Sequence, residues 1–200
     1  MIAELSATAV RLFTGVQARW LGCAPDLTQR IYFANHTSNF DFLVLWSVLP
    51  SDARRKTRPV AASDYWRAGR LRSYVAEHVF RGILIERKNI NRSNNPMDQL
   101  VAALKRGESL ILFPEGGRTA EPEMRPFKSG LYHLGKEMPE VDLVPVYLDN
   151  ANRVLPKGEF FPIPFICSAN FGAPLHVRPD ESKDGFLARA RAAVAAMAKP

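Results

Sequence analysis

The N-terminal segment of the chain carries apolar side chains at the spacing of an amphipathic helix. Its apolar stripe consists of Leu5, Ala9, Leu12, Phe13, Val16, Trp20 and Leu21. This pattern predicts a helix over Ile2–Leu21. Charged residues such as Glu4 and Arg11 interrupt the segment, so it does not fit a simple membrane-spanning helix. Such a helix can pack on its own domain or lie in a membrane interface, with Trp20 near the lipid headgroups, and the sequence leaves both alternatives open.

Beyond this segment, short apolar runs alternate with helical stretches. The runs predict strands at Arg30–Asn35, Arg58–Ala62, Gly82–Arg87, Ser109–Phe113, Val141–Leu148 and Phe165–Phe171. The stretches between them predict helices at Asn39–Leu49, Tyr65–Val79, Pro96–Arg106, Lys128–Glu137 and Gly185–Met197, and the Pro-rich segment Leu155–Phe165 is expected to be a loop. Continuous apolar strands between helices are typical of a sheet buried on both faces. We therefore expect residues 30–200 to form one α/β domain, a mostly parallel central sheet flanked by helices, after an amphipathic helix and linker over residues 1–29.

The composition is that of a globular protein with one strongly basic region. The 200 residues carry a net charge of +7, and the stretch from Ser51 to Arg92 alone holds eleven Lys and Arg against four Asp and Glu. A concentrated positive field favours a negative partner, such as anionic lipid, a phosphorylated substrate, an acidic carrier protein or nucleic acid, although a solvated basic surface fits equally well. The two cysteines, Cys23 and Cys167, are too few for a disulfide framework and fit a reducing compartment.

Polar residues cluster where the first apolar strand gives way to an apolar helix, in the sequence NHTSNFD that starts at Asn35. Ser38 or Asn39 can cap the helix, which places Asp41 in its first turn and His36 in the loop just before it. A carboxylate that accepts from one imidazole nitrogen fixes the tautomer and leaves the other nitrogen free to take a proton. His36 and Asp41 are therefore a candidate general-base pair. Taken alone, they fit a loop histidine and a cap carboxylate better.

A second polar cluster, FPEGGRT, follows the predicted strand Ser109–Phe113. The paired glycines Gly116 and Gly117 let the backbone approach a ligand closely, and exposed amides beside Arg118 suit a phosphate. Lys128, at the start of the next predicted helix, can add positive charge. The spacing is not that of the phosphate loop of nucleotide hydrolases. Taken alone, the pattern fits a tight turn with a surface arginine better than a binding site.

A third cluster, GILIER, ends at Arg87. This arginine closes a predicted strand, and side chains at strand ends of α/β sheets commonly face the ligand crevice. The alternative is an ordinary strand-terminal charge that pairs with Glu86 or Glu115.

Together these clusters resemble the sequence motifs of the glycerolipid acyltransferases. NHTSNFD resembles the NHxxxxD motif of that family, FPEGGRT resembles its FPEGTRS block, and GILIER resembles its G-x-x-[FI]-I-x-R block. The run Val144-Pro145-Val146 resembles a fourth block, an apolar V-P-V/I strand. The four blocks occur in the family order between Asn35 and Val146, a little over half of the chain.

The resemblance implies an O-acyltransferase of phospholipid biosynthesis. Such an enzyme moves a fatty acyl group from an acyl thioester to the free hydroxyl of 1-acyl-glycerol 3-phosphate (lysophosphatidic acid) and forms phosphatidic acid. His36 is then the general base, Asp41 orients it, and the chain supplies no nucleophile. Glu115 orders its loop or bonds the glycerol hydroxyl. The remaining residues of the implied substrate site are Arg87, Arg118, Gly116, Gly117 and Lys128.

The same resemblance sets the expected partners. The co-substrate is acyl-CoA or acyl carrier protein, and neither another cofactor nor a metal is expected. The basic region from Ser51 to Arg92 can receive either donor or anionic lipid. The N-terminal helix is expected to contact the membrane surface, so that the protein lies on the cytoplasmic face of the cell membrane as a peripheral or monotopic protein. No nucleic-acid-binding motif accompanies the basic region, and nucleic acid is not an expected partner.

Two departures from the family pattern concern the acceptor. Gly117 replaces the usual Thr, and Thr119 replaces the usual Ser. Loss of the Thr hydroxyl and a looser backbone can change how the acceptor is held. Glycerol 3-phosphate, a lyso-ornithine lipid or another lysolipid are therefore alternative acceptors. A hydrolase that uses water, and a silent membrane- or carrier-binding module, are the alternatives outside acyl transfer to an alcohol.

Overall fold

In the described part of the chain, seven strands form one sheet at the centre of the domain. The computed structural model describes residues 2–38, 40–86, 95–118, 123–150 and 166–198. The strand order is β1 (Gln17–Trp20), β7 (Ser168–Phe171), β6 (Asp142–Asp149), β2 (Arg30–Ala34), β5 (Ser109–Leu112), β3 (Thr57–Ala62) and β4 (Ile83–Ile85). Neighbouring strands run parallel except for β6 and β7. The predicted α/β class with a mostly parallel sheet is confirmed.

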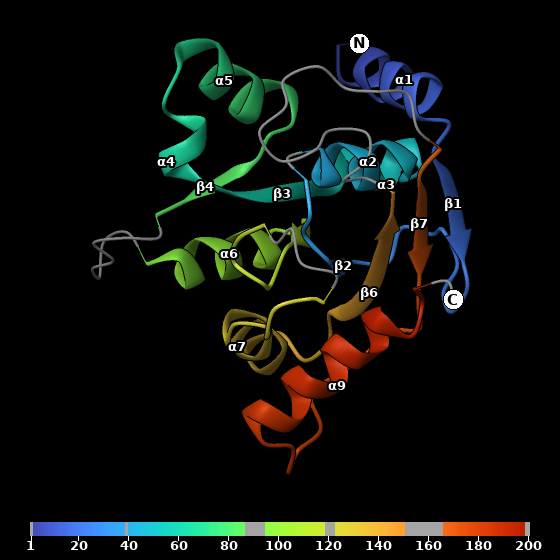
Figure 1. The fold of residues 1–200 in the computed structure, drawn as a ribbon. Coiled ribbons are helices and arrows are strands. Elements are labelled where there is room, and N and C mark those ends of the chain that lie inside the picture. The colour runs from blue at the N-terminus through green and yellow to red at the C-terminus, as the bar shows by residue number, and fades with distance from the viewer. Residues whose placement is uncertain (1, 39, 87–94, 119–122, 151–165, 199–200) are drawn as a thin grey trace.

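Helices cover both faces of this sheet (Figure 1). One face carries α1 (Ile2–Thr14) and α2 (Asp41–Val48), and the other carries α6 (Pro96–Lys105), α7 (Gly130–Glu137) and α9 (Lys183–Ala195). Both strands at the centre, β2 and β5, are buried along their whole length. Continuous apolar runs therefore predicted these two strands correctly, because neither face of the sheet meets water.

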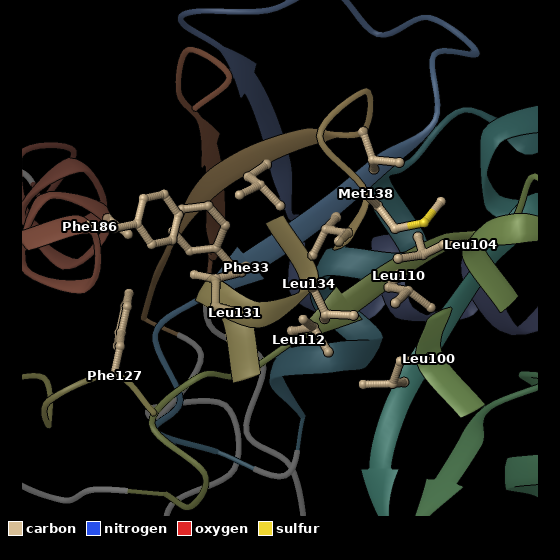
Figure 2. Close-up of a cluster of buried hydrophobic side chains, with 14 of the residues drawn as sticks. Phe33, Leu100, Leu104, Leu110, Leu112, Phe127, Leu131, Leu134, Met138 and Phe186 are labelled. Atoms are coloured by element: carbon tan, nitrogen blue, oxygen red, sulfur yellow. The ribbon is translucent and has the colours of Figure 1, made fainter. Parts of the chain in front are cut away.

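Side chains of β2 alternate between the two cores, as the pleat of a strand requires. Tyr32 and Ala34 belong to the core under α1 and α2, whereas Ile31 and Phe33 belong to the opposite core. Figure 2 shows the second core, which contains Phe33 and side chains of the three helices on that face. The labelled members from the helices are Leu100, Leu104, Leu131, Leu134 and Phe186. Each large side chain buried in this way stabilises the fold by about 1.5–3 kcal/mol.

The predicted N-terminal helix is wrong beyond Thr14. Gly15, with φ at +56°, ends α1, and its amide donates to the carbonyl of Arg11 at 2.8 Å. The chain then forms the edge strand β1, which pairs parallel to β7, and Trp20 stacks on Phe171 with ring centroids 3.9 Å apart. The apolar spacing of four between Val16 and Trp20 suits one face of a strand as well as a helix, since four is an even number.

The predicted single helix Tyr65–Val79 is divided in the structure. Three short pieces replace it, namely α4 (Ser63–Trp66), α5 (Arg70–Tyr74) and a π-helical turn over Val75–Val79. Gly69 lies in the break between α4 and α5, where its backbone freedom makes a continuous helix costly. A further short helix, α3 (Ser51–Lys56), was not predicted from the sequence.

The other predicted elements are present with bounds that differ by a few residues. The helix Pro96–Arg106 corresponds to α6, whose Asn95 cap accepts from the amide of Met97 at 3.1 Å. The helix Lys128–Glu137 begins later, at Gly130. The predicted loop Leu155–Phe165 and the predicted site residue Arg87 lie outside the described residues, as do Asn39 and Thr119.

Candidate active site

The three loops that carry the polar clusters meet because their strands are neighbours. Strands β2 and β5 run parallel with Phe33 opposite Leu112, so the chain leaves both strands at the same edge of the sheet. Asn35 then fixes the loop after β2 to β6 on its other side. Its amide nitrogen donates to the carbonyl of Leu148 at 3.0 Å, and its oxygen accepts from the amide of Leu148 at 2.7 Å. This clamp was not expected from the sequence, which gives no strand order.

His36 and Asp41 lie together at this edge. The distance from His36 Nδ1 to Asp41 Oδ2 is 2.9 Å. The same carboxylate oxygen accepts from the backbone amides of Thr37 at 2.7 Å and Ser38 at 2.8 Å. Asp41 is fully buried, whereas the His36 side chain is 20% exposed and lines a cleft. Since a carboxylate at Nδ1 can only accept, Nδ1 carries the hydrogen and Nε2 is the nitrogen left for a ligand.

Helix α2 begins at Asp41, so the expected position of this residue in the first turn is confirmed. The expected cap at Ser38 or Asn39 is wrong, because the cap residue is Phe40 and it makes no side-chain cap bond. The hydroxyl oxygen of Ser38 instead accepts from the amide of Phe40 at 3.1 Å, before the helix starts. The histidine ring also stacks on Phe113, with centroids 4.3 Å apart, which restricts its orientation.

Glu115 connects the first polar cluster to the second. Its side chain is buried, and Oε1 accepts from the backbone amide of His36 at 2.7 Å. The other oxygen, Oε2, accepts from the backbone amide of Arg125 at 3.0 Å. These contacts order two loops, which is the first of the two roles expected for this residue.

The two glycines of the second cluster differ in what the structure requires. Gly116 has φ at +70°, a backbone conformation that disfavours other residues, whereas the atom nearest to a Cβ there, Lys128 Cε at 2.4 Å, belongs to the end of a flexible side chain. A Cβ on Gly117 would meet Arg125 Nη1 at 3.8 Å, an ordinary contact. The backbone amide of Lys128 donates to the carbonyl of Pro114 at 2.8 Å, which holds the lysine beside the glycine turn.

The cleft beside His36 has a volume of about 690 Å³. The residues that line this cleft include His36 and four residues of the second cluster and the segment after it, namely Gly116, Gly117, Arg118 and Lys128. Most of its other walls are apolar, with contributions from Phe42, Phe80, Leu84, Met97, Leu100 and Leu134. A cleft with cationic side chains beside the His36 imidazole and apolar side chains along its walls suits a ligand that is anionic at one end and apolar at the other.

The third cluster forms part of the same cleft. Gly82 begins the approach to β4, and a Cβ there would lie 3.2 Å from the carbonyl oxygens of both Ala76 and Pro59. The glycine therefore allows the chain to pass closely beneath the π-helical turn, whose Ala76 lines the cleft. Glu86 also lines the cleft, and its carboxylate accepts from the hydroxyl of Ser63 at 2.9 Å.

Neither cysteine is placed as a nucleophile. Neither Cys23 nor Cys167 forms a disulfide, and neither lines the cleft. Burial, and then the negative charges of Asp149 and Asp41, raise the pKa of the Cys167 thiol to about 11. Burial also raises the pKa of Cys23. In the described part of the chain, no group of three or more His, Cys, Asp and Glu side chains is placed to hold a metal.

Residues 24–149 match the sequence profile of a protein family described as Acyltransferase. A 1-acyl-sn-glycerol-3-phosphate acyltransferase of Limnanthes alba is 30% identical over 167 residues, which cover 81% of this chain and 56% of that protein. The human 1-acyl-sn-glycerol-3-phosphate acyltransferase alpha is 28% identical over 154 residues, with coverage of 74% and 51%. The Haemophilus influenzae protein of that name is 25% identical over 162 residues, with coverage of 70% and 62%. The chain thus spans about half the length of the curated relatives that it matches.

The fold is similar to a solved structure, the crystal structure of the 1-acyl-sn-glycerophosphate (LPA) acyltransferase PlsC from Thermotoga maritima. The TM-score is 0.74 at 18% sequence identity, and the similarity covers 97% of this chain and 76% of that one. At this identity the likeness concerns the fold alone.

Proposed function

Because this chain belongs to the acyltransferase family, we propose that it transfers a fatty acyl group from an acyl thioester to the free hydroxyl of 1-acyl-glycerol 3-phosphate and so forms phosphatidic acid. The observation that carries this proposal is the His36–Asp41 pair in the wall of a cleft with cations beside the histidine and apolar walls beyond. The relatives named above are 1-acyl-sn-glycerol-3-phosphate acyltransferases, and their names support this acceptor.

His36 acts as the general base in the proposed reaction. Its Nε2 removes the proton from the acceptor hydroxyl as the oxygen attacks the thioester carbonyl. The C–O bond forms, the C–S bond breaks, and the imidazolium returns the proton to the leaving thiolate. Asp41 holds the ring in the required tautomer and stabilises the imidazolium. A positioned base of this kind contributes about two to four powers of ten in rate.

The cations of the cleft hold the acceptor phosphate in this proposal. Arg118 and Lys128 line the cleft within reach of the glycine turn, and each can donate a charge-assisted hydrogen bond to a phosphate oxygen. Arg87, which lies outside the described residues, is proposed as a further phosphate ligand. Glu115 keeps the turn in register with His36 through its two backbone contacts.

Helix α1 supports the proposed contact with a membrane surface. It is docked on the domain, since Ala7 is fully buried and Glu4 forms an ion pair with the buried Arg54. Its outer side remains apolar, with Leu5 64% and Leu12 81% exposed. A docked helix with an apolar outer side fits shallow insertion into the lipid interface. We place the protein at the cytoplasmic face of the cell membrane as a peripheral or monotopic protein.

The described residues contain no helix both long and apolar enough to cross a membrane. The acyl donor is proposed to be acyl-CoA or acyl carrier protein, and the exposed arginines of the basic region, among them Arg67, Arg70 and Arg72, suit the negative charge of either.

The test is an acyl-transfer assay with labelled 1-acyl-glycerol 3-phosphate in lipid vesicles, supplied with acyl-CoA and acyl carrier protein in turn. We expect labelled phosphatidic acid from the unaltered protein and a loss of about 10²–10⁴-fold in kcat for His36→Ala, which removes the base. His133→Ala, at an exposed position of α7, is the matched control and should keep full activity. Undiminished transfer by folded His36→Ala protein would end the proposed mechanism.

The presence of glycine at position 117, where the family has threonine, favours a second candidate acceptor. The backbone at this position has room for a Cβ, so the family threonine is absent without a steric reason. A panel of glycerol 3-phosphate, a lyso-ornithine lipid and 1-acyl-glycerol 3-phosphate, each with one acyl donor, separates the candidates by kcat/KM. If another acceptor has the higher kcat/KM, that acceptor replaces 1-acyl-glycerol 3-phosphate in the proposal, and the proposed acyl-transfer chemistry stands.

A further inference from the structure

Arg125 lies over the glycine that departs from the family pattern. Its Nη1 is 3.8 Å from the position that a Cβ of Gly117 would occupy. Gly117 lines the cleft, whereas the Arg125 side chain is exposed and is not among the residues that line it. No sequence motif indicates a role for this arginine.

The backbone at Arg125 is fixed relative to the catalytic base. Its amide donates to Glu115 Oε2 at 3.0 Å, and the other oxygen of the same buried carboxylate accepts from the amide of His36 at 2.7 Å. Two residues later, Phe127 is buried in the core, and Lys128 is tied to Pro114. These anchors fix the backbone at and after Arg125, so that only its exposed side chain has to be ordered when an anion binds, which lowers the entropy cost.

Three cations therefore surround the paired glycines. The Lys128 Nζ is 2.6 Å from the position of a Cβ on Gly116, Arg125 lies over Gly117, and Arg118 follows directly in the chain. Within the described residues, none of these three side chains forms an ion pair with a carboxylate. Positive charge that no carboxylate among the described residues compensates suits a dianion better than a monoanion.

We propose that Arg125 is a specificity-determining residue that binds the acceptor phosphate together with Arg118 and Lys128, and that Gly117 leaves the space through which its guanidinium reaches that phosphate. A phosphate monoester offers three terminal oxygens and close to two negative charges, one oxygen for each cation, whereas a phosphodiester offers two oxygens and one charge. The arrangement selects a monoester acceptor. This inference rests on the proposed function.

A threonine at position 117 would fill the space that the guanidinium needs. No positive φ is found at Gly117, and the Cβ itself would make an ordinary contact, so Gly117→Thr should fold normally. The hydroxyl and methyl beyond that Cβ would stand between Arg125 and the turn. Gly117 and Arg125 are thus expected to act as a coupled pair.

The experiment measures KM for 1-acyl-glycerol 3-phosphate, KM for the acyl donor, and kcat in four variants and one control variant. We expect Arg125→Ala to raise the acceptor KM about 10-fold, the lower end for loss of a charge-assisted hydrogen bond, with kcat and donor KM unchanged. Arg125→Lys should recover part of the affinity. Gly117→Thr should raise the acceptor KM, and adding Arg125→Ala to it should change little, because neighbouring positions couple. Arg191→Ala on α9 is the matched control and should leave all three constants unchanged.

The outcomes separate this inference from the proposed function. If the unaltered protein does not acylate 1-acyl-glycerol 3-phosphate, the proposed function fails. If it does so and Arg125→Ala keeps the same acceptor KM, the role of Arg125 is overturned while the function stands. A change in donor KM alone also overturns it. Independent, additive effects of Gly117→Thr and Arg125→Ala would break the proposed coupling.

Discussion

Strand β2 has a buried charge near each end, and the two ends use that charge differently. At the amino end of the strand, Arg30 is 3% exposed, donates to the carbonyl of Ala24 at 2.7 Å and pairs with Asp26 at 2.8 Å. Beyond the carboxyl end, Asp41 is fully buried and holds His36 together with two backbone amides.

The difference lies in what the partners of each charge face. Arg30, Asp26 and Ala24 do not line the cleft, and Arg30 serves to tie the chain before β2 to the sheet. His36 is bound on one ring nitrogen and lines the cleft with the rest of the ring. A buried charge by itself therefore does not mark a catalytic site. A candidate catalytic site is indicated instead by a titratable side chain that is hydrogen-bonded on one side and faces a cavity on the other.

The largest effect is expected at the carboxyl end, from Asp41→Asn. The amide lacks the negative charge that stabilises the imidazolium, and its NH2 group can donate to Nδ1 and hold the ring in the wrong tautomer. We therefore expect kcat to fall by at least about 10³-fold, as loss of the orienting carboxylate does in catalytic triads. Single-turnover acyl transfer measures the change. Asp184→Asn, exposed on α9, is the control. Retention of more than a tenth of the activity would remove the distinction between the two ends.

The next effect is expected at the amino end, from Arg30→Met. The substitution leaves the carbonyl of Ala24 without its buried donor and Asp142 without a nearby cation at 4.0 Å. We expect the free energy of unfolding to fall by about 2–3 kcal/mol, with kcat of the folded protein unchanged. Urea denaturation and specific activity, measured on the same preparation, test both parts. A fall in kcat without a loss of stability would contradict the structural role of this end.

The sequence predicted the core strands well because burial on both faces leaves a continuous apolar run. Strands β2 and β5 follow that rule without exception. The end of α1 was mispredicted because Val16 and Trp20 fit either periodicity, and the deciding contact, the stacking of Trp20 on Phe171, joins residues far apart in the chain. Periodicity carries no information on such contacts.

The contact between His36 and Asp41 could be predicted because the two residues are close in the sequence and form part of a recognisable motif. The contacts that support it depend on the strand order. Asn35 reaches Leu148 and Glu115 reaches His36 only because β2 lies between β6 and β5. Arg125 belongs to none of the four sequence blocks, and its position near Gly117 depends on how the chain folds after that glycine. Local patterns could therefore indicate the base, but not the residues that hold it.

The smallest effect is expected from Asp26→Asn, and it depends on pH. The amide of Thr28, which donates to Asp26 Oδ1 at 3.0 Å, and the positive charge of Arg30 lower the pKa of the Asp26 carboxyl below its ordinary value. A lowered pKa in the folded state stabilises the protein above the ordinary pKa of about 4, and that contribution is lost as the pH falls through the folded value.

Because Asp26 is 46% exposed, the loss of stability in Asp26→Asn at pH 7 should be at most about 1 kcal/mol. The asparagine keeps an oxygen for the amide of Thr28, so the charge is the main thing removed. Thermal melts of both proteins at pH 7, 5 and 3 should show a difference that shrinks toward pH 3, while kcat at pH 7 stays the same. A difference of constant size would mean that the charge of Asp26 does not act on Arg30, and that hydrogen bonds alone hold the amino end of β2.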